Sequence, residues 1–351
     1  MVWDTVVIGA GQAGLAVGYW LNRSRAENNN FLILDRSMEA GEVWQGRYES
    51  LRLFTPRSHN ALPGLPLEGE SDGFPDKNEM SLYLQKYAVH FGLPIQFGTD
   101  VTSVRKERGV FIIDSSQGQY QAKKLVIATG PFQQPNVPTY SQKVSDNVLQ
   151  MHSSSYRHPS QLQEGDVLVV GGGNSGAQIA VELSEGRKTY LALGQQPKYL
   201  PLKIGTKSIF WWLDTLGILK AASSSWIGRR LRRQGDPIFG YELKEAVRCG
   251  KVILKKRTVD VSGLGVLFQD GSELAVRNII WATGFKSRYS WLHIEGALDS
   301  DGQVLHSRGV SSVDHLYFVG LPWQTHRGSA LLAGVGRDAR LIVEAMNEKR
   351  E

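Results

Sequence analysis

The sequence predicts an α/β fold with two Rossmann-like dinucleotide-binding domains, one inserted into the other. Two glycine fingerprints of the form G-x-G-x-x-G, at 9–14 and 171–176, each follow a short apolar strand and open a helix. Two later apolar strands both end in Ala-Thr-Gly, at 128–130 and 282–284, where small residues let the backbone approach a ligand. The duplication indicates two nucleotide sites more strongly than either fingerprint alone.

The first fingerprint lies between a strand over 4–8 and a helix expected from Gln12 to about residue 22. Gly9 permits the tight turn, Gly11 leaves room for a pyrophosphate, and Gly14 lets the helix pack close to the strand. The N-terminus of that helix then points at the phosphates.

A second strand over 31–34 ends in Asp35, where a carboxylate that binds a ribose belongs. A helix over 79–90 follows, with Asp76 or Asn78 as its cap. Further strands are expected over 95–97, 101–106, 110–114 and 119–122, before the strand that ends at Gly130.

The region 131–165 carries four of the 13 prolines and is interpreted as an interdomain connection. This connection is followed in sequence by the second fingerprint, its helix from residue 177 and a strand over 189–193. One nucleotide is then interpreted as a tightly held flavin and the other as a transient nicotinamide. We predict that 1–160 is the first part of an FAD-binding domain with its linker, 161–285 the NAD(P)H-binding domain, and 286–351 the closing part of the FAD domain.

The region 201–250 is less regular. It holds the apolar stretches 209–213 and 216–219, and then the basic cluster Arg229, Arg230, Arg232 and Arg233. One interpretation is a helical insertion over the mouth of the site, with a solvated basic face; the other is an element that contacts a membrane surface or a lipid substrate. We favour the first, because the apolar and basic stretches are separate in sequence.

Composition excludes several other classes of protein. The 40 Lys and Arg against 34 Asp and Glu give a net charge of +6, which is too small and dispersed to indicate a nucleic-acid partner. The single cysteine, Cys249, cannot form a disulfide framework, a redox pair or a cysteine-based metal site within one chain, and we expect no metal. No signal peptide precedes the first strand, and no run approaches the length of a membrane span, so we expect a cytoplasmic protein.

With both fingerprints and both Ala-Thr-Gly strand ends, the chain resembles a flavin-containing monooxygenase, from the small bacterial branch of the class B flavoprotein monooxygenases. Similar features are Gly41-x-x-Trp44, the stretch Leu-Arg-Leu-Phe-Thr-Pro at 51–56, and the segment 75–87, which leads into the expected helix. The resemblance covers essentially the full length. It implies FAD, NADPH or NADH, O2 and a small-molecule substrate, and a homodimer is common for it. It also implies a C4a-(hydro)peroxyflavin that oxygenates sulfides and amines, with ketones (Baeyer–Villiger oxidation) as a further class.

The chain departs from the family's linker motif, F-x-G-x-x-x-H-x-x-x-[YFW]. His152 and Tyr156 match, but Asp146 and Val148 stand in place of the Phe and Gly. His152 is therefore either a catalytic residue or a linker histidine whose ring binds backbone groups. A second departure is Phe54, which stands where larger members have an asparagine, so we expect Phe54 to face the flavin.

The third departure concerns the choice of nicotinamide. NADPH-specific relatives carry an arginine just after the strand 189–193, which pairs with the 2′-phosphate. Here Gly194, Gln195 and Gln196 follow. Gln195 can hydrogen-bond a ribose hydroxyl without requiring a phosphate, and the nearby Lys198 can replace the arginine in part, so we expect NADH to be accepted as well as NADPH.

The resemblance also implies a set of contact residues. For FAD these are Gly9, Gly11, Gln12, Gly14, Asp35, Arg36, Val43, Trp44, Thr129, Gly130 and Gln324. The alternative for Trp44 is that it packs in the hydrophobic core and does not contact the cofactor. For the nicotinamide they are Gly171, Gly173, Asn174, Ser175, Gly176 and Gln195, and Phe54 and His152 are the catalytic candidates.

Two other functions use the same plan. A flavin disulfide reductase needs a redox cysteine near the flavin, and neither fingerprint contains one. An NAD(P)H oxidase or redox sensor without oxygenation needs no further residues, and the incomplete linker motif keeps it as an alternative.

Overall fold

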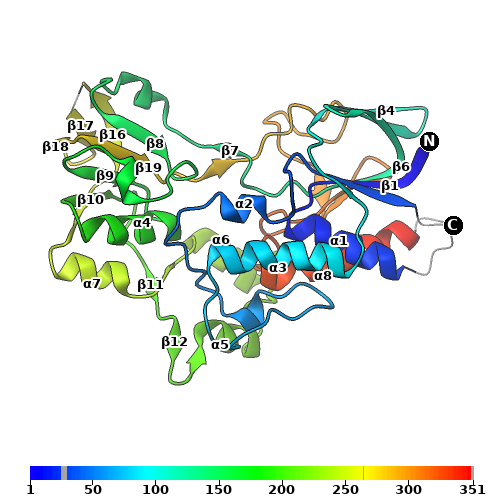
Figure 1. Ribbon diagram of the computed structural model, residues 1–351, viewed down its shortest axis with the longest axis horizontal. Coiled ribbons are helices and arrows are strands. Elements are labelled where there is room, and N and C mark those ends of the chain that lie inside the picture. The colour runs from blue at the N-terminus through cyan, green and yellow to red at the C-terminus, as the bar shows by residue number, and fades with distance from the viewer. Residues whose placement is uncertain (25–29, 264, 349–351) are drawn as a thin grey trace.

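The computed structural model describes residues 1–24, 30–263 and 265–348, which form two open sheets with helices packed against them (Figure 1). The first sheet has the order β21-β22-β23-β6-β1-β2-β3, with the β4–β5 hairpin continuing from β6. The second has the order β15-β10-β9-β19-β8. The predicted α/β fold with two Rossmann-like sheets is confirmed.

The first sheet is built around β1, which is hydrogen-bonded in parallel to β2 and β6. Val6, Val7 and Ile8 are buried because apolar side chains cover both faces of the sheet. The strands of this sheet are β1 (Val2–Ile8), β2 (Phe31–Leu34), β3 (Ile95–Gln96), β4 (Val101–Glu107), β5 (Val110–Ser115), β6 (Gly118–Ile127), β21 (His306–Ser307), β22 (Val310–Ser311) and β23 (Leu316–Phe318).

Three helices belong to this first domain on one side of its sheet: α1 (Gln12–Arg23), α3 (Lys77–His90) and α8 (Leu332–Glu348) (Figure 1). Asp76 caps α3 in a capping box with Glu79, so the helix begins two residues before the predicted start. The predicted strand over 119–122 and the strand that ends at Gly130 are one strand, β6. The last helix, α8, begins at Leu332, just after the turn at 328–330.

The second sheet contains β8 (Leu149–His152), β9 (Val167–Val170), β10 (Thr189–Ala192), β15 (Val252–Lys255) and β19 (Asn278–Trp281), with α4 (Asn174–Ser184) and α7 (Glu242–Arg248) on one face. The three-stranded sheet of β16 (Thr258–Ser262), β17 (Gly265–Phe268) and β18 (Glu273–Ala275) covers the other face. A short pairing of β7 (Gln134–Pro135) with β20 (Phe285–Lys286) connects the domains.

The connection 131–165 is more ordered than expected, because β8 pairs in parallel with β19 inside the second sheet. In strand pairing the second domain thus begins before the predicted boundary at residue 160. Which nucleotide each domain binds stays a prediction.

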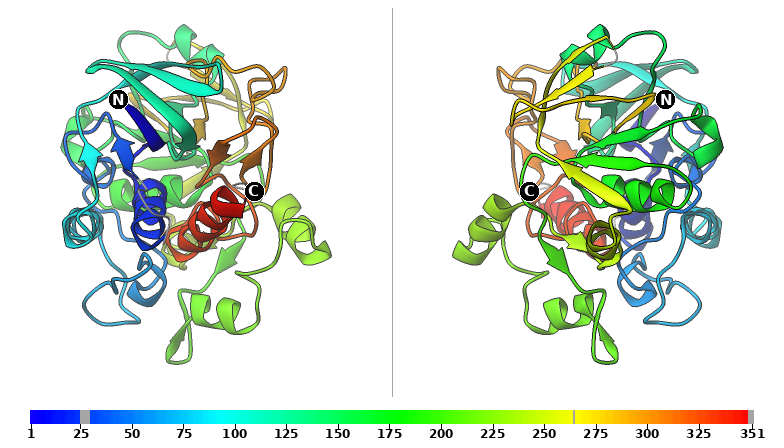
Figure 2. Two further views of the ribbon diagram at one scale, coloured as in Figure 1. Left: turned by 90° about the vertical axis from the view of Figure 1, so that its right-hand side faces the viewer. Right: turned by 90° about the vertical axis from the view of Figure 1, so that its left-hand side faces the viewer.

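The segment 201–234 stands apart from both sheets. It contains the hairpin of β12 (Lys203–Ile204) and β13 (Lys207–Ser208), α5 (Ile209–Thr215) and α6 (Trp226–Gln234). The strand before it, β11 (Tyr199–Leu200), pairs with the strand after it, β14 (Ile238–Phe239). Figure 2 shows α6 projecting from the side of the molecule, and the hairpin with α5 at its lower end. Within the described residues, no helix has the length and apolar character needed to cross a membrane.

Candidate nucleotide and oxidation site

The first glycine loop has the geometry of a pyrophosphate cradle. Gly9 has φ +107°, and a Cβ atom there would lie 2.6 Å from the carbonyl oxygen of Ala128, at the first Ala-Thr-Gly strand end. A Cβ at Gly14 would lie 1.7 Å from the carbonyl oxygen of Gly9, whereas one at Gly11 would have no atom within 4 Å. No side chain caps α1, which leaves its first N–H groups available to phosphate oxygens.

The second loop repeats this plan. Gly171 has φ +122°, and a Cβ there would lie 2.1 Å from the carbonyl oxygen of Ala282, at the second Ala-Thr-Gly strand end. A Cβ at Gly176 would lie 2.1 Å from the carbonyl oxygen of Gly171, and one at Gly173 would again meet nothing within 4 Å. Both loops therefore fit a dinucleotide, as the fingerprints predict.

Asp35 lies where the fingerprint requires, beside the first loop. Its carboxylate accepts hydrogen bonds from the backbone N–H of Ala10 and, at 2.7 Å, from that of Ser37. These bonds hold the loop against β2. Arg36 and Val43 are both exposed, and a contact with the cofactor stays a prediction for Asp35, Arg36 and Val43.

Two of the predicted FAD residues use their amides within the protein. Gln12 donates to the carbonyl oxygen of Ala330 at 2.8 Å and so ties α1 to the turn before α8. Gln324 is buried; it accepts from the N–H of Leu321 at 3.3 Å and donates to the carbonyl oxygen of Arg308 at 3.4 Å. These bonds give the Gln324 side chain a structural role in its turn.

Trp44 lies on α2 (Glu42–Gln45) and is partly buried against the core of the first domain, as its core alternative requires. The segment is fixed by Lys77, whose buried Nζ donates to the carbonyl oxygens of Gln45 at 2.9 Å and Arg47 at 2.8 Å. Sequence reasoning missed Lys77, because a lysine in the first turn of a helix usually indicates a solvated face.

Arg47 lies between the two Ala-Thr-Gly strand ends. Its guanidinium is 5.2 Å from the ring centre of Phe132 and 5.4 Å from that of Phe285. Phe132 follows Gly130 by two residues, and Phe285 directly follows Gly284. Burial lowers the pKa of Arg47. Arg47 therefore links the two nucleotide domains, a role that its place in sequence did not reveal.

His152 contacts the second strand end from β8. Its Nε2 donates to the carbonyl oxygen of Gly284 at 2.9 Å, and its Nδ1 accepts from the backbone N–H of Ser154 at 3.1 Å. Burial lowers the pKa of His152, which favours the neutral ring that these bonds require. Both ring nitrogens are thus engaged, and the geometry favours the linker-histidine alternative over a catalytic role.

Phe54 is part of an aromatic stack with the insertion. Its ring centre lies 4.5 Å from that of Phe239 with an interplanar angle of 13°, and 6.0 Å from that of Phe210 on α5. Asn174, at the start of α4, accepts from the N–H of Phe239 at 2.9 Å and donates to the carbonyl oxygen of Pro237 at 3.1 Å. This packing supports the interpretation of the segment as a cover. The contact of Phe54 with a flavin stays a prediction.

The family model of pyridine nucleotide-disulphide oxidoreductases matches residues 6–197, more than half of the chain. The chain belongs to this family. An uncharacterized oxidoreductase, CzcO, from Bacillus velezensis is 55% identical over 99% of both chains.

Two further similarities are to monooxygenases. A flavin-containing monooxygenase from Stenotrophomonas maltophilia is 28% identical, with a TM-score of 0.82 and full coverage of both chains. The probable indole-3-pyruvate monooxygenase YUCCA1 from Arabidopsis thaliana is 28% identical, over 99% of this chain and 91% of its own. The predicted membership of the flavin-containing monooxygenases is confirmed, and with it the class of enzyme, an oxidoreductase.

An arginine that the sequence pattern did not indicate lies beside the predicted nicotinamide loop, after β10. Gly194 and Gln195 are exposed on the loop after β10. A Cβ atom at Gly194 would lie 2.8 Å from Nη2 of Arg257. Arg257 follows β15, which is paired in parallel with β10, so both loops leave the same edge of the sheet. The two positions are far apart in sequence, and only the strand order brings them together.

Proposed function

We propose that the protein is an FAD-dependent monooxygenase that uses NAD(P)H and O2 to oxygenate sulfides and amines, with ketones as a second class. The observation that carries the proposal is the pair of glycine loops of one geometry, each packed on its own Ala-Thr-Gly strand end. FAD, when bound, supplies the chemistry by accepting a hydride and passing electrons to O2. The protein supplies binding, orientation and a dry site.

The residues have separate roles in this proposal. The loop from Gly9 to Gly14, with Asp35, would hold FAD, and the loop from Gly171 to Gly176 would hold the nicotinamide nucleotide. Arg47 and His152 fix the junction where the two strand ends approach each other. The aromatic stack of Phe54, Phe210 and Phe239 would exclude water from the site at this junction.

The sequence contains one cysteine, Cys249, which is exposed at the end of α7. Disulfide reduction by a pair of cysteines within this chain is therefore not supported. The oxidase or redox sensor remains the second candidate, because it needs no residue beyond those already described. The predicted homodimer stays a prediction.

Both nicotinamides are accommodated in this proposal. Arg257 would pair with the 2′-phosphate of NADPH, and Gln195 would hydrogen-bond a ribose hydroxyl of either nucleotide. We expect a less than hundredfold difference in kcat/KM between NADPH and NADH. A larger preference for NADPH would contradict the proposed role of the Gly194–Gln195 loop.

The test is oxygen transfer by the FAD-loaded protein. Methyl phenyl sulfide, benzylamine and cyclohexanone are each supplied with NADPH under ¹⁸O2, and product, ¹⁸O content and H2O2 are measured. We expect labelled product that accounts for most of the NADPH consumed with at least one class. If all the electrons appear as H2O2 with every class, the protein is an oxidase or a sensor.

A further inference from the structure

The segment 201–234 concentrates the charge of the protein. It holds seven lysines and arginines against one acid, Asp214, so its formal net charge equals the +6 of the whole chain. The basic residues are Lys203, Lys207, Lys220, Arg229, Arg230, Arg232 and Arg233. Among the described residues, no acid forms an ion pair with any of the four arginines of α6, although Lys207 pairs with Asp72 and Lys220 with Asp214.

The same segment exposes large apolar side chains. The exposed fraction is 69% for Trp226, 68% for Leu216, and 48% for Ile204 and Ile227. Trp211 and Trp212 on α5 are each 38% exposed. Of the tryptophans in the described chain, those classed as exposed all lie in this segment. Such apolar exposure is costly in water and indicates a partner.

The two helices bury little of their outer surface. On α5, Ile209 and Phe210 pack inward toward Phe54, so the two tryptophans face outward. On α6, only Gly228 is buried among its residues, all of which the structure describes. Its ends are nonetheless anchored: Ser223 donates from its N–H to the carbonyl oxygen of Thr325 at 2.8 Å, and Asp236 lies 3.7 Å from Arg327.

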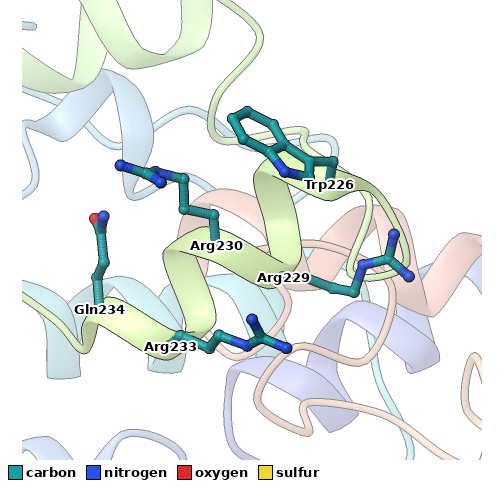
Figure 3. Close-up of a pocket in the computed structure, with 5 residues that line it drawn as sticks. All are labelled: Trp226, Arg229, Arg230, Arg233 and Gln234. Atoms are coloured by element: carbon teal, nitrogen blue, oxygen red, sulfur yellow. The ribbon is translucent and has the colours of Figure 1, made fainter.

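The arginines of α6 are spread around the helix. Figure 3 shows Arg229 and Arg233 on one side and Arg230 with Gln234 on the other, around a pocket of about 300 Å³ that Trp226 also lines. Figure 2 shows that α6 projects from the side of the protein and that the β12–β13 hairpin projects from its lower end.

We propose that this segment, which we term the basic insertion, docks the enzyme on the surface of an anionic lipid bilayer. Arginine and lysine attract anionic headgroups, and tryptophan, leucine and isoleucine enter the interface between headgroups and acyl chains. Charge complementarity identifies the partner, because a second copy of the chain would place +6 against +6. Exposed apolar side chains beside the arginines favour a bilayer over a nucleic acid, whose phosphates need only the charge.

The test is co-sedimentation of the full-length, FAD-loaded protein with vesicles. We expect binding to vesicles of phosphatidylcholine with phosphatidylglycerol, little binding to phosphatidylcholine alone, and release as salt rises from 0.05 to 0.5 M. The double substitution R229E/R233E should lower the partition coefficient at least 25-fold, at about fivefold for each arginine lost.

The control is K244E/R248E, which makes the same change of charge at the same spacing, at two exposed positions of α7 in the second domain. It also removes the exposed ion pair of Arg248 with Glu245, which contributes little to stability. It should leave binding within about twofold, and FAD content and thermal unfolding should be unchanged in both variants. A third variant, W226S/I227S, retains every charge and should lower binding at least fivefold.

Three results would overturn the proposal. The first is equal loss of binding in the α6 and α7 variants, because that shows only a general charge effect. The second is unaltered binding in W226S/I227S together with displacement by duplex DNA at equal phosphate, which indicates a nucleic-acid surface. The third is failure to bind either vesicle, with a dimer in solution that R229E/R233E dissociates.

Discussion

His152 donates a hydrogen bond from Nε2 to the carbonyl oxygen of Gly284, 2.9 Å away. The bond joins the linker strand β8 to the turn that ends β19, where the second domain meets the first. Its Nδ1 must be unprotonated to accept from Ser154, so the arrangement depends on a neutral ring.

This relationship predicts a dependence of stability on pH. Burial lowers the pKa of His152 in the folded state, so the unfolded state takes up a proton first as pH falls through about 6.5. The neutral ring therefore makes its full contribution to the free energy of unfolding above that pH, and the contribution is lost as the pH falls further. At pH 7.5, H152Q should be less stable by about 1–3 kcal/mol.

Because glutamine does not titrate, the difference between wild type and H152Q should shrink as pH falls to 5.5. Thermal unfolding of both proteins at several pH values measures it, and the other buried histidines are common to both. A difference that stays constant with pH would contradict the role of the neutral ring.

The second and third glycines of the first loop, Gly11 and Gly14, should respond differently to alanine. At Gly11 a methyl group meets no protein atom, so G11A should fold with a nearly unchanged Tm and lose FAD. At Gly14 the methyl group would collide with the carbonyl oxygen of Gly9, so G14A should be destabilised even without cofactor. Flavin absorbance after desalting and the Tm of the apoprotein measure the two effects.

The control is the equivalent position of the second loop. G173A should retain FAD and lose binding of NADP⁺, because a Cβ there also stands in open space before the helix. Loss of FAD from G173A and not from G11A would reverse the predicted assignment of the two domains.

Arg257 should select for the 2′-phosphate. R257Q removes the guanidinium beside Gly194, and we expect about 10- to 100-fold weaker NADP⁺ binding, which corresponds to about 1.4–2.7 kcal/mol. NAD⁺ binding should change less than twofold. Titration calorimetry with both nucleotides measures this, and K256Q serves as a control for the loss of a neighbouring exposed charge. An equal loss for NAD⁺ and NADP⁺ would show that Arg257 only supports the loop.

Local sequence was sufficient for the nucleotide loops and the strands that precede them. The first and third glycines of each loop are required by close contacts within a few residues or with one neighbouring strand. Apolar runs such as 4–8 and 167–170 form strands where both faces of the sheet are covered. The expected turn, helix start and small strand end therefore all lie where the pattern placed them.

Only the tertiary structure showed which distant residues contact these loops and strand ends. Arg257 reaches Gly194 because β15 is the parallel neighbour of β10, and Arg47 lies between Phe132 and Phe285 because two domains meet there. His152 hydrogen-bonds the backbone carbonyl group of Gly284 because β8, which carries it, joins the second sheet next to β19. Sequence patterns report periodicity and local turns, whereas these contacts depend on the order in which distant strands pair and on the packing of one domain against the other.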